Sequence, residues 1–126
     1  MRMFAITAAA LLILSSGAYA QGHNHGTDRK GPHGGPMQDV ADVEAELVVA
    51  DKVLTVHVYD EAGKSVPAAG YSGSALVGGS QGRQVVQLAP GDGNTLSGTA
   101  AAAVARGAPV TLQLKAPGGK TGQARF

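Results

Sequence analysis

Three of the four histidines in the chain, His23, His25 and His33, lie within eleven residues and are surrounded by glycine. Neutral imidazole is the commonest metal ligand among protein side chains. Glycine gives the backbone enough freedom to bring several imidazoles onto one ion. The cluster therefore predicts a site for a divalent transition metal, and Cu, Ni, Zn and Co all accept this type of ligand.

The histidines could bind metal in two ways, which the sequence leaves open. If a signal peptidase cuts after Ala20, the new terminus reads Gln21-Gly22-His23. Its amine, two backbone amides and third-position imidazole form a square-planar site that suits Cu(II) or Ni(II), unless Gln21 cyclises and blocks the amine. Alternatively, the three histidines act together, with Asp28 as a weaker oxygen ligand. A solvated tail with incidental histidines is the simpler interpretation.

The fourth histidine, His57, lies in a different part of the chain, in the second strand of a predicted hairpin. A turn at residues 50–51 would place Glu44 opposite His57, and a turn at residues 51–52 would place Glu46 there. Cross-strand neighbours lie about 5 Å apart, so either carboxylate could complete half of a metal site with His57. A surface ion pair is the simpler interpretation of this pattern, and we favour it.

The chain that must position these residues begins with an apparent export signal. Residues 1–20 combine Arg2, an apolar run and the pattern Ala-Tyr-Ala, which is typical of a cleavable signal peptide. We therefore expect a periplasmic or secreted protein that has no membrane segment after cleavage. Residues 21–38 contain almost no large apolar side chain and predict a flexible tail.

Residues 39–126 alternate between apolar and polar side chains, and turn residues separate the alternating segments. This pattern is typical of β-strands with one buried face. About seven short strands predict an all-β domain, most simply a small immunoglobulin-like β-sandwich. The expected strands cover residues 43–49, 54–59, 75–77, 83–88, 95–99, 110–114 and 121–126.

Composition excludes several classes of function. The chain has ten Lys and Arg against nine Asp and Glu, and the loss of Arg2 with the signal leaves nine of each. A neutral protein without a basic stripe is not expected to bind nucleic acid. The chain has no cysteine, which excludes disulfides, thiolate metal sites and cysteine nucleophiles. Because no pair of residues matches a catalytic arrangement, we do not expect an enzyme.

Two short motifs resemble part of a known family. The segment Gly31-Pro32-His33-Gly34-Gly35 and the later run from Val58 through Gly63-Lys64 to Pro67 are similar to the start of periplasmic adaptor subunits of metal-cation efflux pumps. The chain also resembles small exported proteins that accompany heavy-metal efflux. The resemblance covers about residues 31–67, with an alternative extent to Phe126, and the chain lacks the helical hairpin and lipoyl-like modules of the adaptors. It implies a free-standing β domain associated with metal, and it suggests His33 as a ligand.

The sequence thus predicts a periplasmic metal-binding protein that buffers a transition metal or delivers it to a component of an efflux system, in connection with heavy-metal resistance. A second hypothesis is an exported interaction module that binds a protein or glycan through its β domain, with an inert tail.

Overall fold

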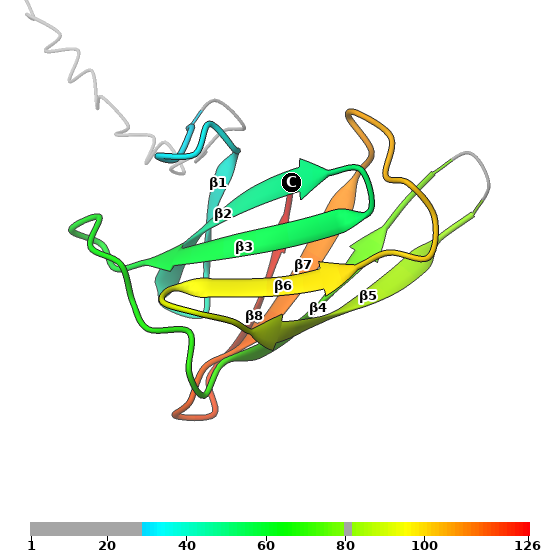
Figure 1. Cartoon of the computed structure of the whole chain (residues 1–126). Coiled ribbons are helices and arrows are strands. Elements are labelled where there is room, and N and C mark those ends of the chain that lie inside the picture. Colours follow the sequence, from blue (N-terminus) through cyan, green and yellow to red (C-terminus); the bar gives the residue numbers. More distant parts are fainter. Residues whose placement is uncertain (1–28, 80–81) are drawn as a thin grey trace, which may run out of the picture.

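The computed structural model describes residues 29–79 and 82–126, and within these residues the fold consists of strands and loops. Eight strands pair antiparallel within these residues, and Figure 1 shows that they curve around a common interior. The strands are β1 (Met37–Val40), β2 (Val43–Ala50), β3 (Val53–Tyr59), β4 (Ser72–Val77), β5 (Gln84–Pro90), β6 (Thr95–Thr99), β7 (Val110–Lys115) and β8 (Thr121–Arg125).

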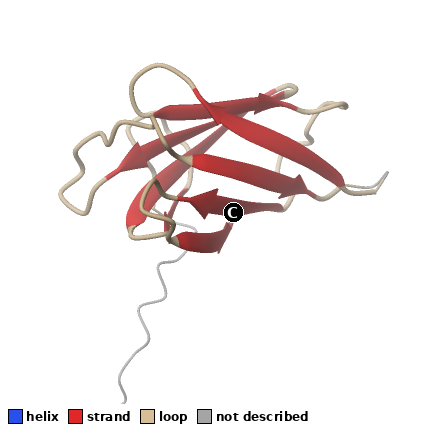
Figure 2. Cartoon of the chain, turned by 90° about the horizontal axis from the view of Figure 1, so that it is seen from below, coloured by secondary structure: helices blue, strands red, loops and turns tan. Residues whose placement is uncertain are grey.

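The strands form one continuous sheet in the order β1-β2-β3-β6-β5-β4-β7-β8, whose ends β1 and β8 come into contact. The sheet is therefore a nearly closed barrel, and Figure 2 shows it from below without any helix between the strands. The all-β prediction is confirmed. The immunoglobulin-like sandwich is not confirmed, because the strands do not divide into two separate facing sheets.

Glycines at two close contacts allow the sheet to curve onto itself. A Cβ at Gly98 in β6 would overlap with the backbone oxygen of Gln87 in β5, and a Cβ at Gly122 in β8 would crowd the backbone of Ala41. Glycine inside a strand often marks such a close backbone approach. The alternation of apolar residues predicts strands, but it does not distinguish a sandwich from a barrel.

The interior of the barrel is filled by the apolar face of each strand. Aliphatic side chains provide most of it, including the fully buried Leu54, Leu96 and Leu112. The predicted hairpin is present, and its register pairs Glu46 with His57. Of the two predicted turns, the one at residues 51–52 is therefore correct. Among the described residues there is no helix of the length and apolarity needed to cross a bilayer.

The chain immediately before β1 lies on the outside of the barrel. We call residues 29–36 the strap; it folds back on itself through a bridge between Lys30 and Pro36. The predicted flexible tail over residues 21–38 is not confirmed for its second half, because the strap and β1 have defined positions. Residues 21–28 of that tail, and the predicted signal peptide, lie outside the described residues.

Candidate functional site

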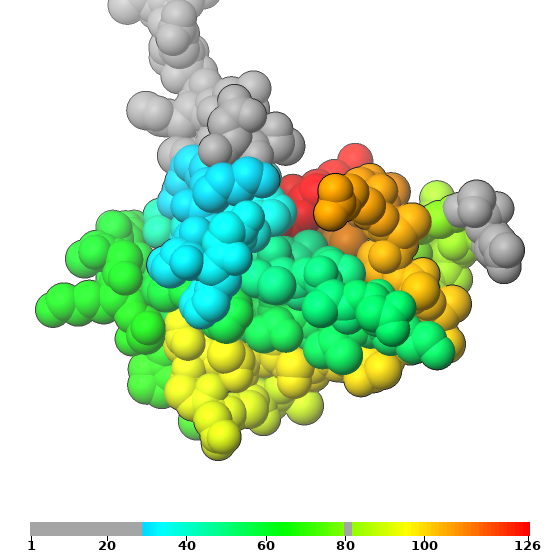
Figure 3. All heavy atoms as spheres, turned by 45° about the horizontal axis from the view of Figure 1, so that its top comes forward, coloured from blue at the N-terminus to red at the C-terminus, as the bar shows by residue number. Residues whose placement is uncertain are grey.

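The strap covers the outer face of β2 and β3. In Figure 3 its residues form a cyan ridge over these strands. Glu46, His57 and Tyr59 point to this outer face, since they alternate with the core residues Ala45, Val56 and Val58. Ala45, Glu46 and Leu47 are all buried, so the burial pattern of β2 loses its alternation beneath the strap.

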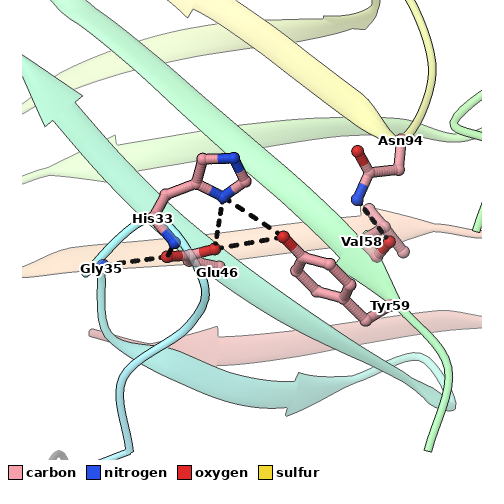
Figure 4. A network of polar contacts seen from close by, with 6 residues as sticks. All are labelled: His33, Gly35, Glu46, Val58, Tyr59 and Asn94. Atoms are coloured by element: carbon pink, nitrogen blue, oxygen red, sulfur yellow. Dashed lines mark hydrogen bonds and ion pairs between the residues drawn. The ribbon is translucent and has the colours of Figure 1, made fainter. Parts of the chain in front are cut away.

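The strap holds the carboxylate of Glu46, whose side chain is 0% exposed. Glu46 Oε2 accepts hydrogen bonds from the backbone N–H groups of His33, at 2.8 Å, and Gly35, at 2.9 Å. Glu46 Oε1 lies 2.9 Å from His33 Nδ1, and the hydroxyl of Tyr59 donates to the same oxygen at 3.3 Å. These contacts are drawn in Figure 4. The buried carboxylate is thus fully supplied with donors.

The glycines of the strap explain why the chain can approach Glu46 so closely. A Cβ at Gly31 would overlap with the carboxylate carbon of Glu46, and a Cβ at Gly35 would overlap with the backbone oxygen of Leu47. Gly34 has a φ of +80°, which is favourable only for glycine. The motif Gly-Pro-His-Gly-Gly therefore encodes a loop that encloses a carboxylate.

Glu46 is ionised at neutral pH in this environment. Burial raises its pKa, but hydrogen bonds from the His33 side chain and from the backbone of Gly35 and His33 outweigh burial, so the pKa lies below its usual value. Burial raises the pKa of Tyr59, and the charge of Glu46 adds to this shift, so the phenol keeps its proton. Both effects match a carboxylate that only accepts hydrogen bonds.

The charge of Glu46 fixes the tautomer of His33. An ionised carboxylate cannot donate, so the proton between the two groups belongs to Nδ1 of His33. In the neutral form of the imidazole the lone pair is on the other ring nitrogen, Nε2, which in Figure 4 points away from the carboxylate. The side chain of His33 is 49% exposed, so solvent and solutes reach the imidazole.

His57 lies directly against His33. The two rings stack with their centroids 3.8 Å apart and their planes inclined by 9°. Nδ1 of His57 is buried and has no hydrogen-bond partner among the described residues. Burial lowers the pKa of His57, the adjacent His33 lowers it further, and Glu46 opposes the change, so His57 is neutral at pH 7.

The predicted pairing of His57 with a carboxylate needs correction in two respects. Glu46 does lie opposite His57, but it is buried and bonds to His33, so the surface ion pair that we favoured is wrong. Glu44 faces Tyr59 and binds Arg29 instead, with 2.6 Å between Arg29 Nη2 and Glu44 Oε1. Arg29 also approaches Asp39, at 3.4 Å, and so fastens the start of the strap.

The sequence-predicted ligands are thus only partly brought together. His33, His57 and Glu46 meet on one face, whereas Glu44 belongs to a separate ion pair. Because the stacked rings are nearly parallel, their in-plane lone pairs do not converge on one point. In residues 29–79 and 82–126, no three His, Cys, Asp or Glu side chains form a ready metal cage. Gln21, Gly22, His23, His25 and Asp28 lie outside the described residues.

Sequence reasoning missed Tyr59 and the role of the strap glycines. Tyr59 continues the outward-facing series Thr55, His57, which identified the polar face of the hairpin, so its position was available from the same pattern. No family model matches the chain, and neither a curated relative nor a solved structure with significant similarity was found. The functional argument therefore depends on the geometry of the site.

Proposed function

We propose that this protein is an exported transition-metal-binding protein in which Nε2 of His33 is a fixed ligand at the base of a histidine-bearing segment. The observation that supports this proposal most directly is the hydrogen bond from Nδ1 of His33 to the buried carboxylate of Glu46. Histidines that bind metal commonly donate their second ring N–H to a carboxylate, which sets the tautomer and raises the basicity of the metal-binding nitrogen.

The remaining ligands in this proposal come from the chain that precedes the strap. His25 and His23 lie eight and ten residues before His33. An extended chain covers about 3.3 Å per residue, so both imidazoles can reach an ion held at His33. With three histidines the site would accept Cu(II), Ni(II), Zn(II) or Co(II). The alternative site at a free Gln21-Gly22-His23 terminus does not require the strap. It predicts that metal binding depends on His23 but not on His33.

His57 supports the proposal as a candidate additional ligand. A buried nitrogen without a hydrogen-bond partner is uncommon, and a bound ion is one explanation of such a group. The imidazole is neutral, as metal coordination requires. Its ring would have to turn out of the stack with His33 before both imidazoles could bind one ion.

The biological role in this proposal is to buffer a metal outside the cytoplasm or deliver it to a component of an efflux system. This role is suggested by the expected export signal and by the short motifs in residues 31–67, for which no matching family was found. The competing hypothesis, an interaction module with an inert tail, makes no use of His33.

Isothermal titration with Cu(II), Ni(II) and Zn(II) tests the proposal on the protein purified with its native terminus. His33→Ala should weaken binding by about tenfold or more, and Glu46→Gln should also weaken it, by about tenfold, because outer-shell partners commonly have effects of this size. Lys64→Ala, which changes an exposed residue outside the strap, is the control. Loss of binding in His23→Ala together with unchanged binding in His33→Ala would favour the amino-terminal site. Unchanged binding in the variant lacking His23, His25 and His33 would refute both sites.

A further inference from the structure

A second candidate surface lies on the outer face of β5, β4, β7 and β8, and it shares no residue with the strap. The strand registers place Gln87 beside Ser74, Ser74 beside Gln113, and Gln113 beside Gln123. Paired residues of antiparallel strands point to the same side of the sheet. Four neighbouring strands thus present a row of three amides and a hydroxyl, about 14 Å long at the usual strand spacing.

These side chains are available to a ligand. The three glutamines are exposed, Ser74 is half-buried, and none of the four has a side-chain hydrogen bond within the described part of the chain. Each amide offers two hydrogen-bond donors and an acceptor oxygen, so the row can bind a ligand that carries many donors and acceptors. The row lines a hollow of about 600 Å³, to which Ser72, Lys115 and Thr121 of the adjacent row contribute.

The charge and the apolar content of this face narrow the class of ligand. Among the described residues, Lys115 lines the hollow and no carboxylate does, which disfavours a cation. Arg125 lies at the far end of the row that contains Leu76, and the amides between the two cations are uncharged. The row on the other side of the amides contains Leu76 and Val85, a cross-strand pair that is 37% and 64% exposed. An uncharged ligand with many hydroxyl groups and apolar C–H faces matches both features.

We propose that this face binds a neutral oligosaccharide. The amide row would bond to sugar hydroxyls, and the Leu76–Val85 pair would contact the C–H face of a sugar ring. A second copy of the chain is the competing occupant. A two-fold interface requires a surface that is complementary to itself. The four strands of this face carry the cations Lys115 and Arg125 but no carboxylate to pair with them, which disfavours a second copy.

The test is a titration of the isotopically labelled chain with cellohexaose, maltohexaose and chitohexaose, followed through its backbone amide resonances. At least one sugar should give saturable shifts centred on Gln87, Ser74, Gln113 and Gln123. Gln113→Ala should weaken that binding by about tenfold, the effect of one well-placed hydrogen bond or slightly more. Thr99→Ala removes an exposed, uncharged side chain from β6 and should leave the affinity unchanged. The resonances also show that each variant is folded.

Two results would overturn the proposal. One is that none of the three sugars shifts the resonances of this face. The other is that sedimentation of the sugar-free chain shows a dimer that Gln113→Ala dissociates, which would identify a second copy as the occupant. Neither result bears on metal binding at His33, because the two surfaces have no residue in common.

Discussion

The barrel has two outer faces with polar side chains, and they differ in whether those side chains have partners. Beneath the strap, Glu46 and Tyr59 are buried and bonded, and Arg29 is paired with Glu44, although Nδ1 of His57 has no hydrogen-bond partner among the described residues. On the face of β5, β4, β7 and β8, the side chains of the amide row make no hydrogen bond within residues 29–79 and 82–126. The same alternating pattern in the sequence can therefore lead to two different surfaces. On one, the outward polar side chains hold a covering segment in place; on the other, they remain available to a ligand.

His33 combines both situations, because one of its ring nitrogens is bonded and the other is open to solvent. Its Nδ1 holds the strap by bonding to Glu46, while its exposed ring keeps Nε2 available. The contacts that fix the strap therefore also orient the nitrogen that we propose as a metal ligand. The predictions below separate these two roles, and they follow the size of the expected effect.

The largest expected effect on stability comes from Glu46→Gln. This change keeps the shape of the side chain but replaces an ionised acceptor that serves His33, Gly35 and Tyr59. Hydrogen bonds to buried charged groups contribute strongly, so we expect the free energy of unfolding to fall by about 2–3 kcal/mol in urea denaturation. Glu44→Gln disrupts a half-exposed ion pair and should cost less than about 1 kcal/mol. An equal loss of unfolding free energy in the two variants would contradict the claim that the strap and Tyr59 stabilise the ionised Glu46.

The strap glycines allow a finer test of the same contact. A Cβ at Gly31 overlaps with the Glu46 carboxylate, whereas a Cβ at Gly34 meets open space and is disfavoured only by its positive φ. Gly31→Ala should therefore destabilise by about 2 kcal/mol and Gly34→Ala by about 1 kcal/mol. Hydrogen exchange at the amides of His33 and Gly35 should accelerate most in Gly31→Ala. A larger acceleration in Gly34→Ala would show that the strap does not close on Glu46.

The covered face should also make stability depend on pH in two windows. His57 has a lowered pKa, chiefly from burial, so the unfolded chain binds more protons than the folded one as the pH falls through about 6.5. The free energy of unfolding should therefore decrease in this range. His33, Glu46 and Tyr59 are the titratable groups that face His57. Glu46 also has a lowered pKa, so a second decrease begins below about pH 4.5.

Urea denaturation between neutral pH and about pH 4 measures both windows. His57→Gln should remove the decrease near pH 6.5 and leave the acid one, while Glu46→Gln should remove the acid one. Stability that rises as the pH falls through 6.5 would mean that His57 is held in its charged form, contrary to its burial next to His33.

The smallest effect is expected on the open face. Gln113→Ala removes an exposed side chain without a hydrogen-bond partner among the described residues, so stability should change by no more than about 0.5 kcal/mol. Thermal denaturation of Gln113→Ala and Glu46→Gln under the same conditions compares the stability lost on the two faces. A loss comparable to that of Glu46→Gln would mean that the amide row supports the fold, and it would remove the difference between the two faces.

The sequence predicts the strands well because their alternation reflects burial on one side of a sheet. It predicts the hairpin of β2 and β3, and one of its two alternative registers, Glu46 with His57, is correct. It misses β1, since Met37–Val40 adjoins a polar, glycine-rich segment that carries no periodic signal. It also misses the closure of the barrel, because closure depends on close contacts at Gly98 and Gly122.

The candidate site could be predicted only in part, for a similar reason. Histidine clustering identified His33, and strand register identified His57 and Glu46. The burial of Glu46 depends on where the strap folds, and this is a tertiary contact between segments separated by more than ten residues. The glycine-rich composition of residues 31–35 suggested flexibility, whereas these glycines are needed because the loop must pass close to a carboxylate and to the backbone of β2.

The central claim is that the hydrogen bond from Nδ1 of His33 to Glu46 orients Nε2 of His33 for a metal ion. The most direct measurement is the affinity for Zn(II), Cu(II) and Ni(II) in the wild-type protein, His33→Ala and Glu46→Gln, by calorimetry at neutral pH. The account predicts that at least one metal binds the wild type and that both substitutions weaken its binding by about tenfold or more. Binding that is equal in all three proteins, or absent from the wild type, would contradict it.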